Sequence, residues 1–438
     1  MSSPKTSSRP RVCVIGLDGT PASYLRSRID AGGLPNLAGL AGEGTLMSAR
    51  APLPPISSVS WASASTGTNP GRHGVFGFVE RKPASWDITF TNVHTIAEPP
   101  VWALAGAAGM RSVVLNIPGT YPAQPQPNGG SLVSGFVSPT LERSVQPPEL
   151  VGFLQEQAYL IDVDLGLGHR DLEAFWSQLV AHHGARTRVF TGLLDRDPPD
   201  LFFCAFTGTD RLHHFLWGQM ERGEEPWAGR FHDYYDRVDA SVGELVRRLP
   251  DDCSVILLSD HGFCRLDREV YVNRWLERDG WVALAEPATS ITSVIPERTR
   301  AYCMDPGRLY LNLEGREPGG IVPQAEYASV RAELAEWAAR LPFVARVATR
   351  EEAFAGPKAG RGPDLVLVSK NGWDLKGAVR TTELEGVGKL TGMHTQDDAF
   401  VLVRGARPDG EADVQDVAAT AVAALGLDAS GLDGRVLA

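Results

Sequence analysis

Seven polar residues of this 438-residue chain are candidates for binding divalent metal ions or for attacking a phosphorus atom. Most of them either follow a short hydrophobic run or open a segment with helical spacing. Carboxylates and imidazoles placed in this way can assemble a two-metal site for phosphoryl transfer. The pattern therefore favours a hydrolase. The seven residues are Asp18, Ser57, Asp210, His214, Asp260, His261 and His394.

Asp210 and His214 lie four residues apart at the start of a helical segment, so their side chains project one turn apart from the same face. They can therefore converge on one ion. A helix-capping aspartate and a surface histidine would give the same spacing, and this pair alone does not separate the two interpretations. His213 points to another face of the helix and is not a predicted ligand.

Asp260 and His261 end the most hydrophobic run of their region, and the tight turn that follows lets both side chains face one crevice. A carboxylate beside an imidazole suits zinc or manganese, which accept mixed nitrogen and oxygen ligands. Asp18 follows the apolar run Val12–Leu17 in the same way. Acids at strand ends are often only caps, and His394 lies in a predicted turn where a single histidine is usually just exposed.

Ser57 is the candidate nucleophile. Pro54 and Pro55 require an extended lead-in, and the small and apolar residues that follow predict a helix beginning near Ser57. The Oγ atom of a serine there could bind a metal, while backbone N–H groups and the helix dipole face a phosphate. An ordinary N-cap serine would have the same sequence, and Ser58 and Ser60 compete for the role.

Other phosphate-binding and nucleophile motifs are missing from the sequence. It has no GxxxxGK[ST] loop, no GxGxxG after a strand and no GxSxG elbow. P-loop NTPases, dinucleotide-dependent enzymes and α/β-hydrolases therefore have no support. His73, in a turn after the Ser57 helix, is expected to be structural.

The composition narrows the class of protein further. The formal net charge is −11, whereas a nucleic-acid scaffold needs a basic face, so a nucleic-acid scaffold role is not expected. The predicted phosphoryl-transfer site instead indicates a small phosphate ester as the partner. No run of about 18 apolar residues predicts a membrane span, and the polar start MSSPKTSSRP shows no secretory signal. The five cysteines are scattered without a CxxC pair, which favours buried thiols and a cytoplasmic location. The oligomeric state is not predicted.

Short apolar strands alternate with helical segments along most of the chain. The strands are Val12–Leu17, Leu201–Phe206 and Ser254–Leu258. This alternation predicts an α/β sheet with helices on both faces and a ligand beyond the carboxyl ends of the strands. The predicted helices are Leu34–Ala41, Ser58–Ser65, Trp102–Ala108, Leu172–Leu194 and Tyr234–Arg248.

A small α+β insertion is predicted at residues 290–362, where turn-rich stretches enclose two strands and a helix, and it would lie over the site as a cap. The core would then comprise residues 11–289 and 363–438. Asp364–Val368 and Ala399–Val403 are expected to return to the main sheet. The other predicted elements are the strands Leu309–Leu313 and Val344–Ala348 and the helices Tyr327–Leu341 and Val414–Leu425.

Taken together, these segments resemble the type I phosphodiesterase/nucleotide pyrophosphatase branch of the alkaline phosphatase superfamily. The matching pieces span nearly the whole chain in the family's order, which makes the resemblance more specific than any one motif. They include VIGLDGT, LPNLAGLAGEG, PPISSVSWASASTGTNPGRHGVFGF, NIPGTYP, TDRLHHFLW, LLSDHGF, YVNRWL, GREPGG, PDLVLV, TGMH and DVAATAVAALGL.

The resemblance implies an alkaline-phosphatase-like fold, with a central, mostly parallel sheet flanked by helices, and assigns roles to the seven residues. Asp210, His214 and His394 would hold one metal. Asp18, Asp260 and His261 would hold the other, with Ser57 bound there as nucleophile. The pattern Ser-x-x-x-Trp followed by Thr-Gly selects Ser57 over Ser58. The predicted substrate-binding residues are Ser58, Ser60 and Asn116.

The implied mechanism is a two-step displacement with two divalent ions, zinc by preference and manganese as the alternative. Ser57 would attack phosphorus and form a phosphoseryl intermediate, which water then hydrolyses. Animal members carry threonine and asparagine where this chain has Ser57 and Ser60, so nucleotide specificity does not transfer. The x-Pro-x-Arg pattern of arylsulfatases is absent, and no arginine lies near Ser57 in the sequence, which favours diesters over sulfate esters and monoesters.

Two alternatives stay open at this point. One is a phosphomonoesterase or phosphomutase, for which the cap would supply basic groups to a second phosphate; Arg298, Arg300 and Arg308 are the candidates, although surface arginines would have the same sequence. The other is a catalytically silent binding protein. It is disfavoured because all seven positions carry competent residue types.

Overall fold

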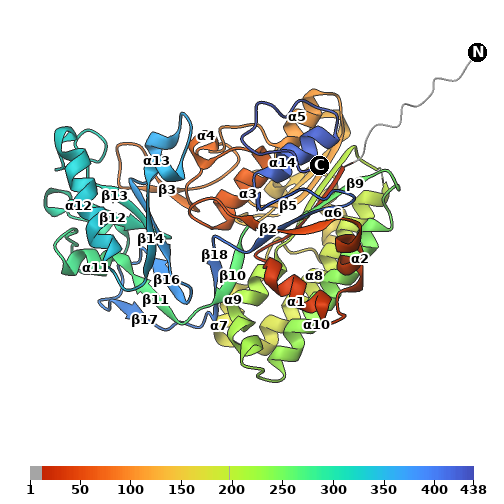
Figure 1. Ribbon diagram of the computed structural model, residues 1–438, viewed down its shortest axis with the longest axis horizontal. Helices are drawn as coiled ribbons and strands as arrows, with labels where there is room; N and C mark the ends of the chain where they lie inside the picture. The colour runs from red at the N-terminus through yellow and green to blue at the C-terminus, as the bar shows by residue number, and fades with distance from the viewer. Residues whose placement is uncertain (1–11, 197) are drawn as a thin grey trace, which may run out of the picture.

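A nine-stranded mixed sheet forms the centre of the larger lobe in the computed structural model, which describes residues 12–196 and 198–438 (Figure 1). The five strands β9, β1, β8, β5 and β6 are parallel to one another, and antiparallel pairs flank them. The strand order is β20 (Ala412–Asp413), β2 (Thr45–Arg50), β19 (Ala399–Val403), β9 (Ser254–Leu258), β1 (Val12–Leu17), β8 (Leu201–Phe206), β5 (Ser112–Ile117), β6 (Ser131–Ser134) and β7 (Val145–Gln146).

The strands predicted at Val12–Leu17, Leu201–Phe206 and Ser254–Leu258 have the same bounds in the structure. Every residue of β1, β5 and β8 is buried. Continuous apolar runs are typical of parallel strands that are covered on both faces. Alternate residues of β1 face opposite sides, since Ile15 belongs to one hydrophobic cluster and Val14 to another. The α/β fold with helices on both faces is therefore confirmed.

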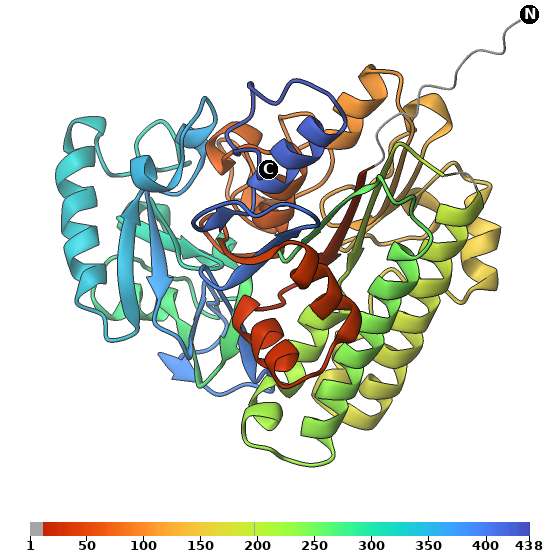
Figure 2. The same ribbon diagram turned by 45° about the vertical axis from the view of Figure 1, so that its right-hand side comes forward.

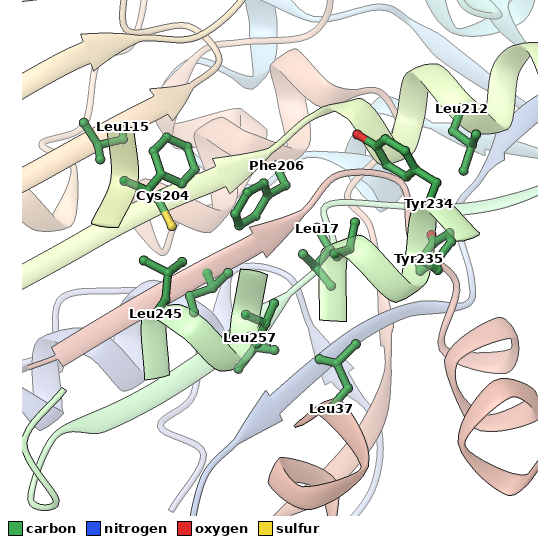
Figure 3. Close-up of a cluster of buried hydrophobic side chains, with 14 of the residues drawn as sticks. Leu17, Leu37, Leu115, Cys204, Phe206, Leu212, Tyr234, Tyr235, Leu245 and Leu257 are labelled. Carbon is green, nitrogen blue, oxygen red and sulfur yellow. The ribbon is translucent and has the colours of Figure 1, made fainter. Parts of the chain in front are cut away.

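Two groups of helices cover the sheet (Figures 1 and 2). On one face Leu17, Phe206 and Leu257 pack against Tyr234 and Tyr235 of the long helix α10 (Figure 3). This face carries α1 (Ala22–Asp30), α2 (Pro35–Glu43), α8 (Leu172–Arg196), α9 (Gly208–Glu221) and α10 (Trp227–Val246); the other carries α3 (Ser57–Thr66), α5 (Val101–Ala107) and α14 (Asp416–Ala424). The predicted helices are all present, although α10 begins at Trp227 instead of Tyr234.

A smaller lobe lies beside the main sheet and holds two further sheets (Figure 1). It has a hydrophobic core of its own, to which α11 (Val272–Arg278) and α12 (Tyr327–Ala339) contribute. One sheet has the order β12 (Ala301–Met304), β13 (Arg308–Leu311), β15 (Leu365–Ser369), β14 (Val344–Thr349), and the other β16 (Trp373–Lys376), β11 (Arg268–Tyr271), β17 (Glu385–Gly386).

The expectation that Asp364–Val368 returns to the main sheet is wrong. Strand β15 instead pairs antiparallel with β13 and β14, with Leu365 opposite Leu309. Leu365 and Leu367 are buried in the core of the smaller lobe, and an apolar run does not by itself specify which of two sheets will bury it. The limits of 290 and 362 for the insertion stay a prediction, and the strands of the two smaller sheets span residues 268–386.

The two-stranded sheet of β10 (Gly262–Arg265) and β18 (Gly392–Thr395) lies between the lobes (Figure 1). It places Phe263 opposite His394. The expectation of a turn at His394 is therefore wrong, because a partner more than a hundred residues earlier in the chain draws this segment into a strand. Within the described ranges, no helix combines the length and apolar character needed to cross a bilayer.

Candidate metal centre

The carboxyl ends of three neighbouring strands bring the predicted ligands together. Strand β1 ends directly before Asp18, and β9 is followed by Asp260 and His261. Strand β8 leads into α9, whose first turn contains Asp210. Because β9, β1 and β8 are adjacent and parallel, these side chains meet at one edge of the sheet, as the sequence predicts.

The first group of ligand atoms comes from α9 and β18. His394 Nε2 lies 3.1 Å from Asp210 Oδ1 and 3.1 Å from His214 Nε2. His214 Nε2 lies 3.4 Å from the same oxygen of Asp210. All three atoms fall within the 4.8 Å mutual spacing expected around one ion. The helical spacing of Asp210 and His214 thus brings their side chains together as predicted.

The second group surrounds His261. Its Nε2 lies 3.3 Å from Ser57 Oγ, 3.4 Å from Asp260 Oδ2 and 3.7 Å from Asp18 Oδ1. Asp210 Oδ1 is 4.0 Å away, so this carboxylate stands between the two groups. Asp18, Asp210 and His261 form the second candidate metal set by mutual spacing. Below, the Asp/His cluster means these three aspartates and three histidines.

The three histidines of the cluster share one orientation. Nδ1 of His214 is 3.2 Å from Gly392 O, Nδ1 of His261 is 3.0 Å from Gly262 O, and Nδ1 of His394 is 3.2 Å from Pro55 O. A carbonyl only accepts, so each Nδ1 carries the proton and each Nε2 is turned toward the cluster as an electron-pair donor. Backbone carbonyls orient metal-binding histidines in proteins in the same way.

Burial sets the charge state of this cluster. It lowers the pKa of His261 and of His394 to about 4, so both imidazoles are neutral at pH 7. Burial also raises the pKa of Asp260 to about 6, and burial together with Asp260 and Asp210 raises that of Asp18 well above its usual value. For Asp210 burial opposes ionisation, but neighbouring groups, among them Arg211, which donates to Asp210 Oδ2 at 2.7 Å, outweigh it and hold the pKa well below its usual value.

Two buried carboxylate oxygens, Asp18 Oδ1 and Asp260 Oδ2, have no hydrogen-bond partner among the described residues. Orphaned oxygens beside neutral imidazoles are costly unless a cation joins them. The donor set of imidazole nitrogen and carboxylate oxygen matches zinc and manganese. The residues therefore fit divalent metal ions, and the identity of the metal stays a prediction.

Neighbouring groups fix the free ends of the aspartates. Trp61 Nε1 donates to Asp18 Oδ2 at 3.0 Å, and the backbone N–H of Gly19 donates to Asp260 Oδ1 at 3.0 Å. Arg211 donates to Asp210 Oδ2 at 2.7 Å and also pairs with Asp162. Sequence reasoning missed Arg211, although its position directly after Asp210 was a usable signal. These contacts leave the other carboxylate oxygens directed at the cluster.

Ser57 is the first residue of α3, following the extended Ile56. The predicted helix start is thus confirmed, although Ile56 and not a serine occupies the cap position. Every residue of α3 is buried, and Ser57 is only 2% exposed. Its Oγ faces His261, whereas Ser58 Oγ and Ser60 Oγ have no partner among the described residues. The contact with His261 distinguishes Ser57 from its two competitors.

The side-chain amide of Asn116 is held at the end of the neighbouring strand β8. It is fully buried in β5 with a positive φ of 65°, and its amide donates to Ala205 O at 2.9 Å and to Thr207 Oγ1 at 3.3 Å. Thr207 immediately precedes α9, so Asn116 supports the helix that carries Asp210. Its substrate-binding role stays a prediction, as do those of Ser58 and Ser60.

His73, which is expected to be structural, and His213, which is not a predicted ligand, both make contacts away from the Asp/His cluster. His73 Nε2 pairs with Ser63 Oγ at 2.9 Å, and burial lowers the pKa of His73 to about 3. His213 turns away from the Asp/His cluster and lies 2.8 Å from the hydroxyl of Tyr235. Neither histidine shares an ion-sized spacing with the predicted ligands.

The three cap arginines do not reach the site. Arg308 is fully buried and pairs with Glu80 at 3.3 Å, so it is neither a free phosphate ligand nor the surface arginine that the sequence left open. Arg300 pairs with Glu333, and Arg298 is exposed. None of the three lines the pocket next to the Asp/His cluster. This leaves them without support as ligands for a second phosphate.

That pocket has a volume of about 870 Å³. Its lining includes His214 and His394, so it opens directly onto the first ligand group. Ile56, next to Ser57, belongs to the lining as well, and Leu367 and Lys376 contribute from the smaller lobe. A substrate bound here would lie between the two lobes with its reacting group at the Asp/His cluster.

Comparison with known families shows to which family the chain belongs. The family described as type I phosphodiesterase / nucleotide pyrophosphatase matches residues 12–397, which is most of the sequence and includes all seven predicted site residues. The chain belongs to this family, a branch of the alkaline phosphatase superfamily.

Solved structures share the fold at low sequence identity. The chain is similar to phosphonoacetate hydrolase from Sinorhizobium meliloti 1021 in complex with phosphonoformate, with a TM-score of 0.63, 18% identity, and 95% and 96% of the two chains covered. It is also similar to murine ectonucleotide pyrophosphatase/phosphodiesterase 5, with a TM-score of 0.59, 15% identity and 97% of each chain covered. A search of curated proteins by sequence gave no match.

Proposed function

We propose that this protein is a two-metal phosphohydrolase that cleaves phosphodiester or pyrophosphate bonds of small molecules through a phosphoseryl intermediate on Ser57. The observation that carries the proposal is the convergence of Ser57 Oγ, three imidazole nitrogens and three carboxylates at one edge of the sheet. Divalent ions bound there would supply the positive charge that stabilises the attacking and leaving oxygens.

The residues of the chain have separate tasks in this proposal. Asp210, His214 and His394 would hold one ion, and Asp18, Asp260 and His261 the other. Ser57 Oγ forms a bond to phosphorus while the ester P–O bond breaks, and the serine proton ends on the leaving alcohol. Water then attacks the phosphoseryl group, which releases the phosphate product and restores Ser57.

The relatives support a small phosphorus ester or phosphonate as the substrate. Phosphonoacetate hydrolase has been solved with phosphonoacetate, and an inactive threonine-to-alanine variant of the murine relative with AMP. A single hydroxyl whose loss inactivates a family member fits a hydroxyl nucleophile. Substrate identity does not transfer at 15–18% identity, so the chemistry of this pocket has to be argued from its own residues.

The test is kcat/KM for a bis-aryl phosphodiester against the matching aryl monoester, with zinc- and manganese-loaded protein. We expect a preference for the diester, and Ser57→Ala should lower its turnover by at least about 10³-fold while bound metal is retained. Ser65→Ala is the matched control, because Ser65 lies on the same helix and bonds only to the backbone of Ala62. A monoester preference would instead indicate a phosphatase or mutase.

Retained activity in the serine variant would contradict the nucleophile assignment. Turnover by Ser57→Ala within tenfold of the parent would transfer the role to Ser58 or to water. No turnover of either ester, with full metal content, would favour a binding protein or a much narrower specificity.

A further inference from the structure

We propose that the pocket between the two lobes binds a bulky, uncharged apolar group of the substrate, so that the protein acts on phosphodiesters of an aryl or alkyl alcohol. This inference rests on the proposed function, because it places the phosphorus atom at the Asp/His cluster. It adds the class of substrate, which neither the family nor the fold supplies.

The position of the pocket determines which part of a substrate fills it. His214 and His394 belong both to the first ligand group and to the pocket lining. Ile56 lines the pocket and immediately precedes Ser57. A phosphorus atom within reach of Ser57 therefore carries its ester substituents next to this space.

Both lobes contribute apolar side chains to the lining. Sixteen of its thirty residues are hydrophobic or proline, Cys264 included. The larger lobe contributes Phe215 of α9 and Met393 of β18, and the smaller lobe contributes Leu367, Val368 and Leu375 from β15 and β16. Side chains from two lobes that face one cavity can enclose an apolar group from opposite sides, which removes more of its surface from water than a flat patch would.

The cations of the lining are already engaged. Lys376 pairs with Asp374 at 2.5 Å, and Lys370 Nζ donates to Pro342 O at 2.6 Å. Arg211 bonds to both Asp162 and Asp210 at 2.7 Å.

The remaining charge of the lining is acidic. Outside the Asp/His cluster, Asp374 is paired with Lys376 and Arg211 is paired with Asp162 and Asp210, which leaves Lys370 beside the three carboxylates of Asp305, Asp397 and Asp398. A substrate with a second phosphate or a carboxylate in this space would meet net negative charge and no uncommitted cation of the lining. An uncharged substituent avoids that repulsion.

The size of the cavity leads to the same class of substrate. About 870 Å³ lies in the upper part of the range for pockets that hold drug-sized ligands. A methyl ester would leave most of this volume to water. Each methylene group that is transferred from water to such a lining is expected to improve binding by about fourfold.

The experiment uses phosphonates, which carry one carbon substituent, cannot be hydrolysed as esters, and leave no choice of which group enters the pocket. Binding of methyl-, hexyl- and phenylphosphonate and of phosphonoacetate to the zinc-loaded protein is measured by calorimetry. We expect hexyl- and phenylphosphonate to bind at least about tenfold more tightly than methylphosphonate, and phosphonoacetate to gain nothing from its carboxylate. Equal affinities, or tightest binding of phosphonoacetate, would overturn the inference.

A pair of valine substitutions locates the effect. Val368→Asp places a charge in the pocket and should remove the preference for hexyl- and phenylphosphonate, whereas Val387→Asp, at a position 78% exposed and outside the lining, should keep it. Val368→Thr keeps the shape of the side chain and should reduce the preference if Val368→Asp does not fold. A preference that survives both changes at Val368 would also overturn the inference.

Turnover is measured separately, on bis-aryl and alkyl aryl phosphodiesters. If the phosphonates bind with the apolar preference but no diester is cleaved, the proposed function fails while the pocket assignment holds. If diesters are cleaved but the phosphonates show no apolar preference, the substrate class fails and the proposed function stands.

Discussion

His214 and His394 hold their Nε2 atoms 3.1 Å apart, although 180 residues separate them in the chain. The Nδ1 atom of each lies 3.2 Å from a backbone carbonyl, of Gly392 and Pro55 respectively, which can only accept a hydrogen bond. The two Nε2 lone pairs therefore face each other beside the carboxylate of Asp210. Such a contact is repulsive unless a proton or a metal ion lies between the three groups, which agrees with the proposal that the pair binds one metal ion.

His214→Ala should lower both the metal content and the rate. The substitution removes one of three donors in the first group, so we expect a loss of up to about one ion per chain, measured by elemental analysis after gel filtration, and at least about a 10²-fold fall in kcat/KM. His94→Ala is the matched control, since His94 is exposed on a loop. Unchanged stoichiometry in His214→Ala would remove it from the ligand set.

Metal removal should destabilise the folded protein. The Asp/His cluster brings buried carboxylates and imidazoles together, and a bound cation stabilises them only in the native state. At a free metal concentration 100 times the Kd, one site contributes about 2.7 kcal/mol. Scanning calorimetry before and after dialysis against a chelator should therefore show a lower Tm in the stripped protein.

Restoration by different ions tests the donor set. Zinc or manganese should return the Tm to its original value, whereas magnesium, which prefers an all-oxygen shell, should restore little of it. An unchanged Tm after treatment with the chelator, in protein shown to have lost its metal, would contradict a stabilising role for metal bound at the cluster.

The main sheet and half of the site could be predicted because the signals are local. The apolar run Val12–Leu17 leads directly to Asp18, and Ser254–Leu258 leads to Asp260 and His261. Parallel strands end at one edge, so a strand assignment already places its acid at the site. The four-residue spacing of Asp210 and His214 on a helix likewise predicted that the two side chains lie together.

The rest of the site depends on pairings that no local pattern encodes. His394 reaches Asp210 because β18 pairs with β10. The two strands are so far apart in the sequence that hydrophobic periodicity cannot reveal their pairing. Strand β15 was assigned to the wrong sheet for the same reason. The dual pairing of Arg211 with Asp162 and Asp210 likewise requires the loop before α7 (Leu165–Arg170) to lie beside α9.

Trp61→Phe should weaken the second ligand group. The substitution removes the indole N–H that donates to Asp18 Oδ2 and leaves a buried carboxylate oxygen without that donor, which costs about 1.5–3 kcal/mol. The indole also packs closely over Gly16, where a Cβ atom would lie 2.2 Å from the ring. We expect weaker metal affinity by competition titration and a lower free energy of unfolding in urea.

A second tryptophan separates the hydrogen bond from the lost volume. Trp102 is also buried on this side of the sheet, but its ring packs edge-on against Phe203. Trp102→Phe should lower the free energy of unfolding while metal affinity stays at the parent's value. Equal metal affinities in both variants would show that the donor to Asp18 does not matter for binding.

Asp364 in the smaller lobe should make stability depend on pH in the acid range. Burial opposes its ionisation, but Arg316 at 2.7 Å and Arg350 outweigh this and hold the pKa of Asp364 below its usual value. A depressed pKa in the folded state means that the stabilisation is complete above the unfolded value of about 3.9 and is lost as the pH falls through the folded value.

Asp364→Asn should therefore lower the unfolding free energy by up to about 3–5 kcal/mol near neutral pH, because the half-buried guanidinium groups of Arg316 and Arg350 lose their shared buried carboxylate. The difference from the parent should shrink as the pH falls below about 4, because Asp364 of the unfolded parent then binds a proton that the folded parent, with its lowered pKa, still lacks. Urea unfolding at pH 7, 5 and 3.5 measures this difference in unfolding free energy. Asp87→Asn is an exposed control, and its unfolding free energy should differ little from the parent's at any pH. A difference that stays constant down to pH 3.5 would mean that Asp364 acts through the shape of its contacts and not through its charge.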